Sequence, residues 1–542
     1  MASSFSAPDS RTAAALRPIV LIFPRAEPDW PDARKVQSFP LGPLHVARPL
    51  VAMGRTVRII DQNVVPRVED VLKTVVDPLW IGFSVIGGHT LVEAIALARR
   101  ARRLFPGVPL VWGGWNPTLM AHLYEDESAA AIVDIVVRGR GEGPVAQLTE
   151  RLAAGQSLAD VPGISWRDRD GKTVRNPDGA FESIAAAEPL PYHLIEEPSR
   201  YIARFGTMTF ISSYGCPHRC GFCGIPVGTR TFRPMENAVV VRELERLKRE
   251  LGIRSVVFLD DNFFTVKDRV LDLARRLIEA ELGLDWHSNG RLDQVGPLTD
   301  EEFALLARSG CRAINVGYET GSQDVADRVQ KDIRVDAIYA VADRFRQSGI
   351  RLSINFMVGL PGETPESLVA SLETLRSIHA RNADLEICWY IYMPAPGTAL
   401  WTELVATGRL TEPRTLVEHS KFQSIDLEHP WFYRSPKRSI FREWRSAHKA
   451  VSFYFFAAFS PEQTIGWLRR RAKRRWDARD FAAPWEWRLF ATLDRIKRSV
   501  RNRLAALGRT RLFATSTDRR RLLRIASTDP SFALVTGAHR ST

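Results

Sequence analysis

Residues 18–150 alternate short apolar runs, rich in β-branched residues, with amphipathic segments. The apolar runs are typical of buried strands, and the amphipathic segments have the periodicity of surface helices. Strands that alternate with helices in this way predict a doubly wound, Rossmann-like parallel sheet in an α/β fold. We expect strands at 18–24, 56–61, 80–86, 108–114 and 134–139, with helices at 41–54 and 91–107.

A different composition follows over residues 151–200, where Gly, Pro and Asp are frequent. These residues favour turns, so the segment is predicted to be a small hairpin and a linker.

A second alternating series occupies residues 201–410. Six strands at this spacing predict a TIM-type (β/α)6 parallel barrel, complete or partial. In such barrels the chemistry lies at the carboxyl ends of the strands. The strands are expected at 207–213, 255–261, 284–290, 313–319, 351–359 and 386–393, with helices such as 238–252 and 300–310 between them.

The two ends of the chain have other patterns. Residues 1–17 lack the long apolar stretch of a signal peptide, and we expect a disordered leader. Residues 411–542 read as mostly helical, aromatic and basic. No run of about 18 apolar residues occurs, which argues against a membrane span. Five cysteines, three of them clustered, favour a reducing, cytoplasmic location over a secreted disulfide framework.

The net charge of +13 is concentrated near the C-terminus. Residues 431–542 contain 26 Lys and Arg, 8 Asp and Glu, and six tryptophans, whereas the rest of the chain is slightly acidic. A basic, aromatic region can contact an anionic membrane surface or a lipid-like substrate, and less readily nucleic acid. An ordinary solvated helical region has the same composition, so these alternatives stay open.

Three cysteines lie within the stretch YGCPHRCGFCGIP, residues 214–226, as Cys216-x3-Cys220-x2-Cys223. Thiolates are soft ligands that suit iron–sulfur clusters or zinc. A loop with this spacing can hold three corners of a cluster and leave one iron free. The alternative is a zinc site completed by His218 or a distant cysteine, but nothing nearby completes four ligands at the usual spacing.

The cysteine loop resembles that of the radical S-adenosylmethionine (SAM) enzymes, and the resemblance extends over about residues 206–400. GYETGS at 317–322 is similar to the family's fourth-strand motif, and GLPGET at 359–364 and PAPGT at 394–398 are similar to its later strand ends. The resemblance implies that Cys216, Cys220 and Cys223 bind a [4Fe–4S] cluster whose fourth iron is chelated by SAM. A flavodoxin- or ferredoxin-type donor would reduce the cluster, and cleavage of SAM would yield a 5′-deoxyadenosyl radical.

Five further residues are candidates for SAM contacts in this resemblance. Asp260 or Asp261 would bind the SAM amine, unless the pair only caps a helix. Arg291 would pair with the SAM carboxylate, or form a structural ion pair. Glu319 would bind a ribose hydroxyl or the amine, unless it is a solvated strand-end carboxylate. Ser322 would sit in a turn beside the cofactor, or in an ordinary loop.

In the first domain, Ser84-Val85-Ile86 and Gly113-Gly114 follow successive strands, and they resemble the S-x-L and GG elements of cobalamin-binding domains. A doubly wound sheet binds ligands at this edge. The D-x-H-x-x-G signature is absent, and His45 lies in a helix, so the lower face of cobalt would be unligated or only covered. Trp115 would cover the corrin or pack internally. The alternative is a Rossmann-like domain that binds no ligand.

The order of the two domains resembles that of cobalamin-dependent radical SAM enzymes. The resemblance favours a methyltransferase that acts on an unactivated carbon of a small-molecule or lipid-like biosynthetic intermediate. An anaerobic oxidative cyclase of the Mg-protoporphyrin monomethyl ester type is the second hypothesis. A non-catalytic cobalamin or redox sensor that contacts nucleic acid through the basic region is the third.

Overall fold

The computed structural model describes most of both predicted α/β regions and part of the C-terminal region. The described residues are 17–26, 39–65, 67–180, 183–195, 198–202, 206–422, 451, 454, 455, 458, 466–481, 484–486, 488, 489 and 492. The expected leader therefore lies almost entirely outside the described residues, as does most of the basic region.

The first sheet has seven strands in the order β2-β1-β3-β4-β5-β6-β7. β1 to β5 are parallel, and β6 and β7 continue the sheet as an antiparallel hairpin. The strands are β1 (Ile19–Phe23), β2 (Val57–Asp61), β3 (Trp80–Ser84), β4 (Leu110–Gly113), β5 (Ile135–Val137), β6 (Ile164–Arg167) and β7 (Thr173–Arg175). The predicted doubly wound sheet is confirmed, and the strand order reverses between β1 and β3, where such sheets bind ligands.

Alternate residues of β1 enter two separate cores, which explains why the strand is apolar throughout. Ile19 and Leu21 pack with α2 and α7 on one face, and Val20 and Ile22 pack with α3 and α4 on the other. The helices and turns of this region are α2 (Leu41–Ala52), α3 (Val68–Leu72), α4 (His89–Leu104), α5 (Trp115–Leu119), α6 (Ala121–Glu125), η1 (Glu127–Ala129), α7 (Glu142–Ala153), η2 (Tyr192–Leu194) and α8 (Ser199–Ile202).

The second sheet has six parallel strands in the order β15-β14-β13-β12-β11-β8. Successive strands are neighbours, and β8 and β15 form the two edges, so the sheet is the partial (β/α)6 barrel that the sequence predicts. The strands are β8 (Thr207–Phe210), β11 (Ser255–Phe258), β12 (Asp285–Arg291), β13 (Cys311–Glu319), β14 (Arg351–Val358) and β15 (Glu386–Ile391).

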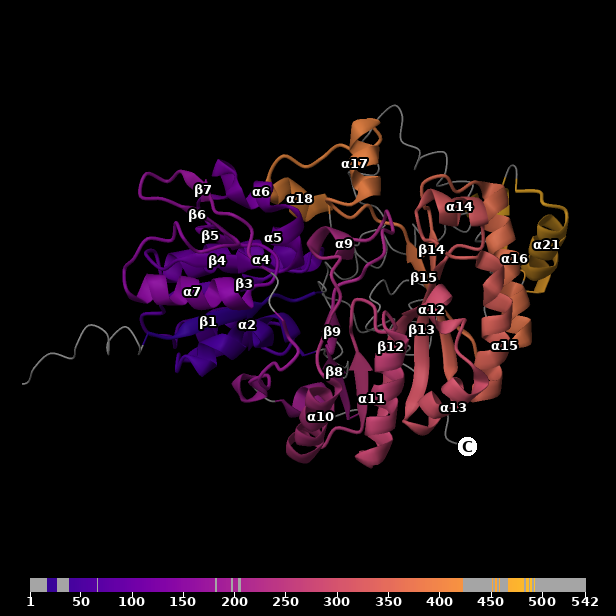
Figure 1. Ribbon diagram of the computed structural model, residues 1–542. Helices are drawn as coiled ribbons and strands as arrows, with labels where there is room; N and C mark the ends of the chain where they lie inside the picture. The colour runs from indigo at the N-terminus through magenta and orange to yellow at the C-terminus, as the bar shows by residue number, and fades with distance from the viewer. Residues whose placement is uncertain are drawn as a thin grey trace, which may run out of the picture.

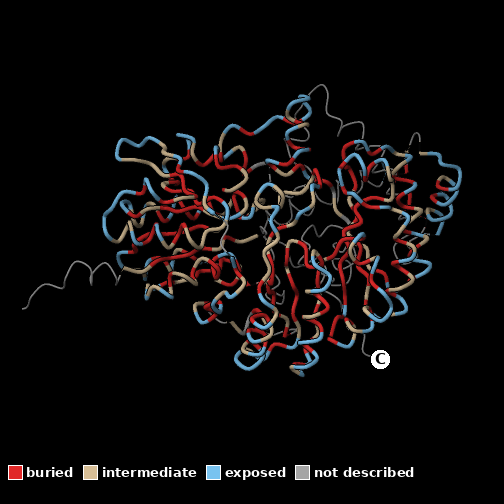
Figure 2. Tube along the Cα trace, in the orientation of Figure 1, coloured by how far each residue is buried: buried red, intermediate tan, exposed pale blue. Residues whose placement is uncertain are grey.

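The helices of this second region are α9 (Ile225–Gly228), α10 (Asn237–Leu251), α11 (Lys267–Glu279), α12 (Leu292–Val295), α13 (Asp300–Arg308), α14 (Gln323–Arg328), η3 (Val335–Ala337), α15 (Ile338–Ser348) and α16 (Pro365–Arg381). The longer of them, α10, α11, α13, α15 and α16, cover the outer face of the partial barrel, and α9 lies toward the first region (Figure 1). A short ribbon of β9 (Ser213–Tyr214) and β10 (Arg233–Pro234) frames the segment that holds the three cysteines. Figure 2 shows buried residues concentrated along both sheets.

The chain returns to the first sheet after the barrel. α17 (Ala399–Ala406) leads to α18 (Leu416–Phe422), which lies beside the helices of the first sheet in Figure 1. There the side chains of His419 and Asn116 are hydrogen-bonded at 2.9 Å. α21 (Gly466–Asp477) packs outside α16, where the Trp476 indole donates to Glu373. Among the described residues no helix has the length and hydropathy needed to cross a membrane.

Candidate functional site

The three cysteines follow β8, at the carboxyl edge of the barrel strands. Gly215 precedes Cys216 with φ of +84°, and a Cβ there would lie 2.1 Å from the Thr231 carbonyl oxygen. Only glycine fits this position. The loop is also tied at Gly221, whose N–H donates to the Val329 carbonyl at 2.8 Å and whose carbonyl accepts from Leu400 N–H at 3.0 Å. The backbone that presents the thiols is therefore fixed at several points.

The thiols are free of disulfides and are buried or half-buried. Burial raises the pKa of Cys216, and it raises that of Cys223 to about 12. Nearby cations oppose this rise in pKa, Arg291 at Cys216 and Lys331 at Cys223. Arg291 Nη1 also donates to Cys220 Sγ at 3.2 Å. Buried thiols become thiolates when a positive metal centre compensates their charge. Among the described residues no three His, Cys, Asp or Glu side chains surround a single metal-ion position.

A buried ion pair lies next to the cysteine loop. Lys331 Nζ contacts Glu319 Oε1 at 3.0 Å, and the two side chains are only 6% and 8% exposed. A Cβ on Gly317 would lie 2.7 Å from Glu319 and 2.9 Å from Lys331, so the glycine leaves the space that the pair occupies. The Lys331 ammonium also lies 5.6 Å from the ring centre of Phe222, which stands between Cys220 and Cys223 in the sequence. Glu319 has φ of +68°, an unfavourable conformation for this residue that is typical of functional sites.

Arg291, the last residue of β12, contacts the cysteine loop in addition to its ion pair with Asp293. Its guanidinium contacts Cys220 Sγ, the Lys331 carbonyl oxygen and Asp293, at 3.2, 2.5 and 3.0 Å. It therefore links the third barrel strand to the second cysteine.

Asp260 and Asp261 follow β11 and support the start of the cysteine loop. Asp260 is buried and accepts hydrogen bonds from Ser212 N–H at 2.7 Å and from the hydroxyls of Ser212 and Ser213. Asp261 accepts from Gly215 N–H at 2.7 Å, and burial raises its pKa to about 6. Both carboxylates thus hold backbone next to Cys216, and neither caps a long helix.

Ser322 begins α14, where its side chain accepts from Val325 N–H at 3.5 Å, so it has the position of a helix N-cap. Gly321 approaches α16 closely: a Cβ there would lie 2.7 Å from Ser371 Cα, and its N–H donates to Ser371 Oγ at 2.9 Å. The GYETGS motif therefore combines one buried ion pair with one tightly packed turn.

The predicted glycine motif lies at the carboxyl edge of the first sheet. Gly114 has φ of +106°, and a Cβ there would lie 2.6 Å from the Val85 carbonyl oxygen. A Cβ on Gly113 would meet Val137 Cβ at an ordinary 3.7 Å. Gly114 is thus required by the packing of the protein, whereas Gly113 leaves local space that a ligand can use. Ser84 faces the start of α2, with its Oγ 2.9 Å from a Cβ placed on Gly42.

Trp115 joins the two regions. A Cβ on Gly228, in the helix α9 that follows the cysteines, would lie 3.0 Å from the Trp115 ring. Its neighbour Leu119 would meet a Cβ on Gly224, directly after Cys223, at 3.4 Å. The helix α5, which starts at the glycine motif, therefore packs on the end of the cysteine loop, as Figure 1 shows for α5 and α9.

Comparisons with known proteins agree with these two regions. A profile described as the radical SAM superfamily matches residues 210–375, and one described as the B12 binding domain matches residues 33–149. The chain is a cobalamin-dependent radical SAM enzyme. Its cofactors are a [4Fe–4S] cluster, SAM and cobalamin, and the thiols, the charged pair and the glycine edge described above fit these three groups.

Curated relatives of this cobalamin-dependent radical SAM enzyme include two classes. An "uncharacterized methyltransferase" of Pyrococcus horikoshii is 26% identical over 401 residues, which are 72% of this chain and 84% of that protein. The anaerobic magnesium-protoporphyrin IX monomethyl ester cyclase of Rubrivivax gelatinosus is 27% identical over 332 residues, which are 59% of this chain and 58% of that protein. The chain thus spans little more than half of the cyclase.

Two solved structures share the fold of the enzyme. One is the methyltransferase TsrM of Kitasatospora setae with cobalamin and a [4Fe–4S] cluster bound. It superposes with a TM-score of 0.64 at 18% identity, and the aligned part is 81% of this chain and 89% of the TsrM chain. OxsB with aqua-cobalamin bound gives a TM-score of 0.62 at 15% identity and covers 96% and 85%. At these identities the likeness establishes the fold alone.

Sequence reasoning missed three charged or aromatic residues of the site. No motif assigns a role to Lys331, Arg140 or Tyr214, because the residues that they contact lie outside their own sequence motifs. The one available signal for Tyr214 was its place in the cysteine stretch.

Proposed function

We propose that the enzyme is a methyltransferase that acts on an unactivated carbon of a biosynthetic intermediate. The observation that carries this proposal is the similarity to the methyltransferase of Pyrococcus horikoshii, which extends over 84% of that protein. A hopanoid C-3 methylase of Methylococcus capsulatus, 24% identical over 72% of both chains, supports the same activity class.

We assign the cluster to Cys216, Cys220 and Cys223, and SAM to the neighbouring charged groups. Glu319 and Lys331 offer a carboxylate and an ammonium beside the cysteines, and these groups suit the amino acid part of SAM. Arg291 acts on the cluster side, since its guanidinium already contacts Cys220. A cation at this thiolate favours the reduced, more negative cluster.

Asp260, Asp261 and Ser322 have supporting roles in this proposal. The two carboxylates position the backbone that leads to Cys216, and Ser322 starts α14. Asp261 also remains the better placed of the two for the SAM amine, because it is half-buried whereas Asp260 is fully enclosed by serines.

Cobalamin is assigned to the carboxyl edge of the first sheet, at Ser84, Gly113 and Gly114. Within the proposed domain of residues 18–150, this edge lies at the strand-order reversal and packs on the cysteine loop of the proposed domain of residues 201–410. Residues 151–200 form the linker and 411–542 the C-terminal region in this proposal. SAM with the reduced cluster supplies a hydrogen-abstracting radical, and cobalamin carries the methyl group. The chain's part is to hold both sites together and to keep water out.

Product analysis tests the activity. Anaerobically reconstituted enzyme, given a reductant, SAM and extracts of metabolites from its native cell, should form both 5′-deoxyadenosine and S-adenosylhomocysteine. With SAM labelled in its methyl group, the label should enter a new product. Formation of 5′-deoxyadenosine without any S-adenosylhomocysteine would contradict methyl transfer.

An oxidative cyclase remains the second candidate because the cyclases of three organisms are among the relatives, at 24–27% identity. The same assay separates the two, because cyclisation transfers no label from SAM. Magnesium-protoporphyrin IX monomethyl ester as the test substrate should then lose hydrogen atoms to the 5′-deoxyadenosyl radical and gain oxygen from water, with 5′-deoxyadenosine as the coproduct.

For partners, we propose a flavodoxin- or ferredoxin-type electron donor in the cytoplasm and a peripheral membrane contact through the basic region. Six of the twelve residues of α21 are Arg or Lys, and Trp467 in this helix and Trp485 after it are about half exposed. Interfacial helices combine charge and tryptophan in this way. Co-sedimentation with phosphatidylglycerol vesicles, lost in 0.5 M salt and absent with phosphatidylcholine vesicles, is the expected result.

A further inference from the structure

The residue two positions before the first cluster cysteine is held by side chains of the cobalamin domain. The Arg140 guanidinium lies 3.4 Å from the ring centre of Tyr214 and stacks on it. The Tyr214 hydroxyl is hydrogen-bonded to His45 Nε2 at 3.1 Å. Burial raises the pKa of Tyr214, and burial with Arg140 and Arg48 nearby lowers that of His45, so both groups are neutral and the contact is a hydrogen bond.

The cobalamin-domain side of this contact is itself braced. Glu142 pairs with Arg140, and it lies 3.7 Å from His45 Nδ1 and 3.9 Å from Arg48. His45 and Arg48 come from α2, Arg140 from the loop after β5, and Glu142 is the first residue of α7, at the same carboxyl edge that carries the glycine motif. A ligand that binds this edge therefore meets a loop whose arginine reaches the cluster domain.

The cluster side has little freedom to absorb a displacement of Tyr214. The Thr231 carbonyl oxygen would lie only 2.1 Å from a Cβ on Gly215, so this backbone is closely packed, and the Gly215 N–H donates to Asp261 at 2.7 Å. Arg140 also lowers the pKa of Asp261, opposing the effect of burial, so its charge acts on the carboxylate that accepts from the Gly215 N–H. Packed segments of this kind transmit small shifts because they do not deform continuously.

We propose that Tyr214 and Arg140 are positioning residues that couple cobalamin binding to the cluster loop. Cobalamin on the first sheet fixes the loop around Arg140, the loop fixes Tyr214, and Tyr214 fixes Cys216. Coupling of this kind is reciprocal, so a loaded cluster must change the affinity for cobalamin by the same factor as cobalamin changes the affinity for the cluster. The inference rests on the proposed cofactor sites but not on methyl transfer.

The test measures binding of hydroxocobalamin to the full chain, with the cluster loaded and with the cluster removed, without any substrate. In the wild type we expect the two dissociation constants to differ at least about fivefold. Tyr214→Phe keeps the ring but loses the hydroxyl contact with His45, so it should reduce the ratio of the two dissociation constants. Arg140→Gln, which loses the stack and the charge, should bring it close to one.

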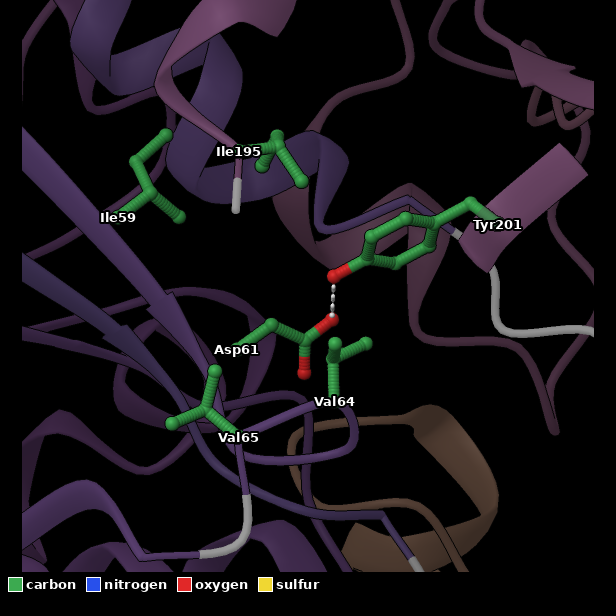
Figure 3. A pocket seen from close by; sticks show the side chains of 6 residues that line it. All are labelled: Ile59, Asp61, Val64, Val65, Ile195 and Tyr201. Carbon is green, nitrogen blue, oxygen red and sulfur yellow. Dashed lines mark hydrogen bonds between the residues drawn. The ribbon is translucent and has the colours of Figure 1, made fainter. Parts of the chain in front are cut away.

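Two matched variants control for general damage. Tyr201→Phe also removes a buried tyrosine hydroxyl, which donates to Asp61 at 2.8 Å in the first sheet (Figure 3). Arg138→Gln removes a buried arginine from the same loop, which binds the Ser165 hydroxyl, the Asn176 carbonyl and Asp178. Both should keep the wild-type factor.

The electron paramagnetic resonance spectrum of the reduced cluster gives a second readout. Added cobalamin, which the reductant converts to cob(II)alamin, should change the g values of the cluster in the wild type and in both controls, and less so in Tyr214→Phe. Equal dissociation constants with and without the cluster in the wild type would overturn the proposal. So would an unchanged factor in Tyr214→Phe and Arg140→Gln. Either result leaves the methyl transfer assay unaffected, so the two proposals fail separately.

Discussion

The two sheets present carboxyl edges of opposite chemical character. The edge of the first sheet has the glycines Gly113 and Gly114 at the end of β4, and its Arg140–Glu142 pair contacts Tyr214 of the cluster domain. The edge of the second is built from buried charges and thiols, among them the Glu319–Lys331 pair and the Arg291–Cys220 contact. A large macrocycle with a nucleotide tail needs space, whereas a small charged cofactor on a redox cluster needs charges arranged in advance. Each edge provides one of the two.

Removal of a cysteine tests this contrast most strongly. Cys220→Ala should lose most of the bound iron and all formation of 5′-deoxyadenosine, because two thiolates cannot hold the cluster in place. Iron analysis and product chromatography measure both effects. Cobalamin should still bind, since the first edge contains none of these thiols, and SAM cleavage by Cys220→Ala would exclude the catalytic assignment.

The buried pair of the second edge gives the next largest effect. Lys331→Met should lower the free energy of unfolding by about 3–5 kcal/mol, because Glu319 remains buried without its partner. Urea denaturation measures this change. The double variant with Glu319→Gln should recover most of the loss in stability but not SAM binding. Equal stability of the single and double variants would show that the pair is not coupled.

The first edge also buries one carboxylate, Asp61 at the end of β2, shown in Figure 3 among Ile59, Val64, Val65 and Ile195. Burial raises the pKa of Asp61 to about 6, against an ordinary 3.8. The folded state then holds its proton more tightly than the unfolded state, so the free energy of unfolding should fall as pH rises from about 4 to 6.

The size of this fall is at most about 3 kcal/mol at 1.36 kcal/mol per pKa unit. Asp61→Asn should remove it, as followed by urea denaturation at pH 4, 5, 6 and 7. Tyr201→Phe should steepen it, because the Tyr201 hydrogen bond lowers the pKa of Asp61. A pH profile identical in the wild type and Asp61→Asn would contradict the assignment.

Alanine at the two glycines gives the smallest and finest test. Gly114→Ala should cost about 1–3 kcal/mol of stability, because it combines a positive φ with a close contact to Val85. Gly113→Ala fits the protein and should leave stability unchanged, but it should weaken hydroxocobalamin binding if the corrin or its tail approaches there. Titration followed by absorbance measures the binding. Iron content should stay constant in both variants, and loss of iron would remove the contrast between the edges.

Much of this architecture was predictable because its signals are local. Residues close together in the sequence determine the apolar runs of the strands and the amphipathic helices between them. The same is true of the spacing of Cys216, Cys220 and Cys223. The order of the barrel strands follows from the preference for short parallel βαβ connections, whereas the reversal between β1 and β3 in the first sheet does not. The roles assigned to Ser84, Gly113, Glu319 and Arg291 stay predictions.

The chain's sequence by itself determined two α/β sheets and a three-thiol loop at a strand end, since periodicity and motif spacing depend only on nearby positions. Only the tertiary structure decided which distant residues meet. It brought Lys331 to Glu319, turned Asp260 toward two serines, and placed Tyr214 against His45, 169 positions away, and against Arg140. The first two contacts depend on how the strand ends and loops of the barrel meet, and the contacts of Tyr214 depend on how the two sheets pack; no local signal in the chain specifies either.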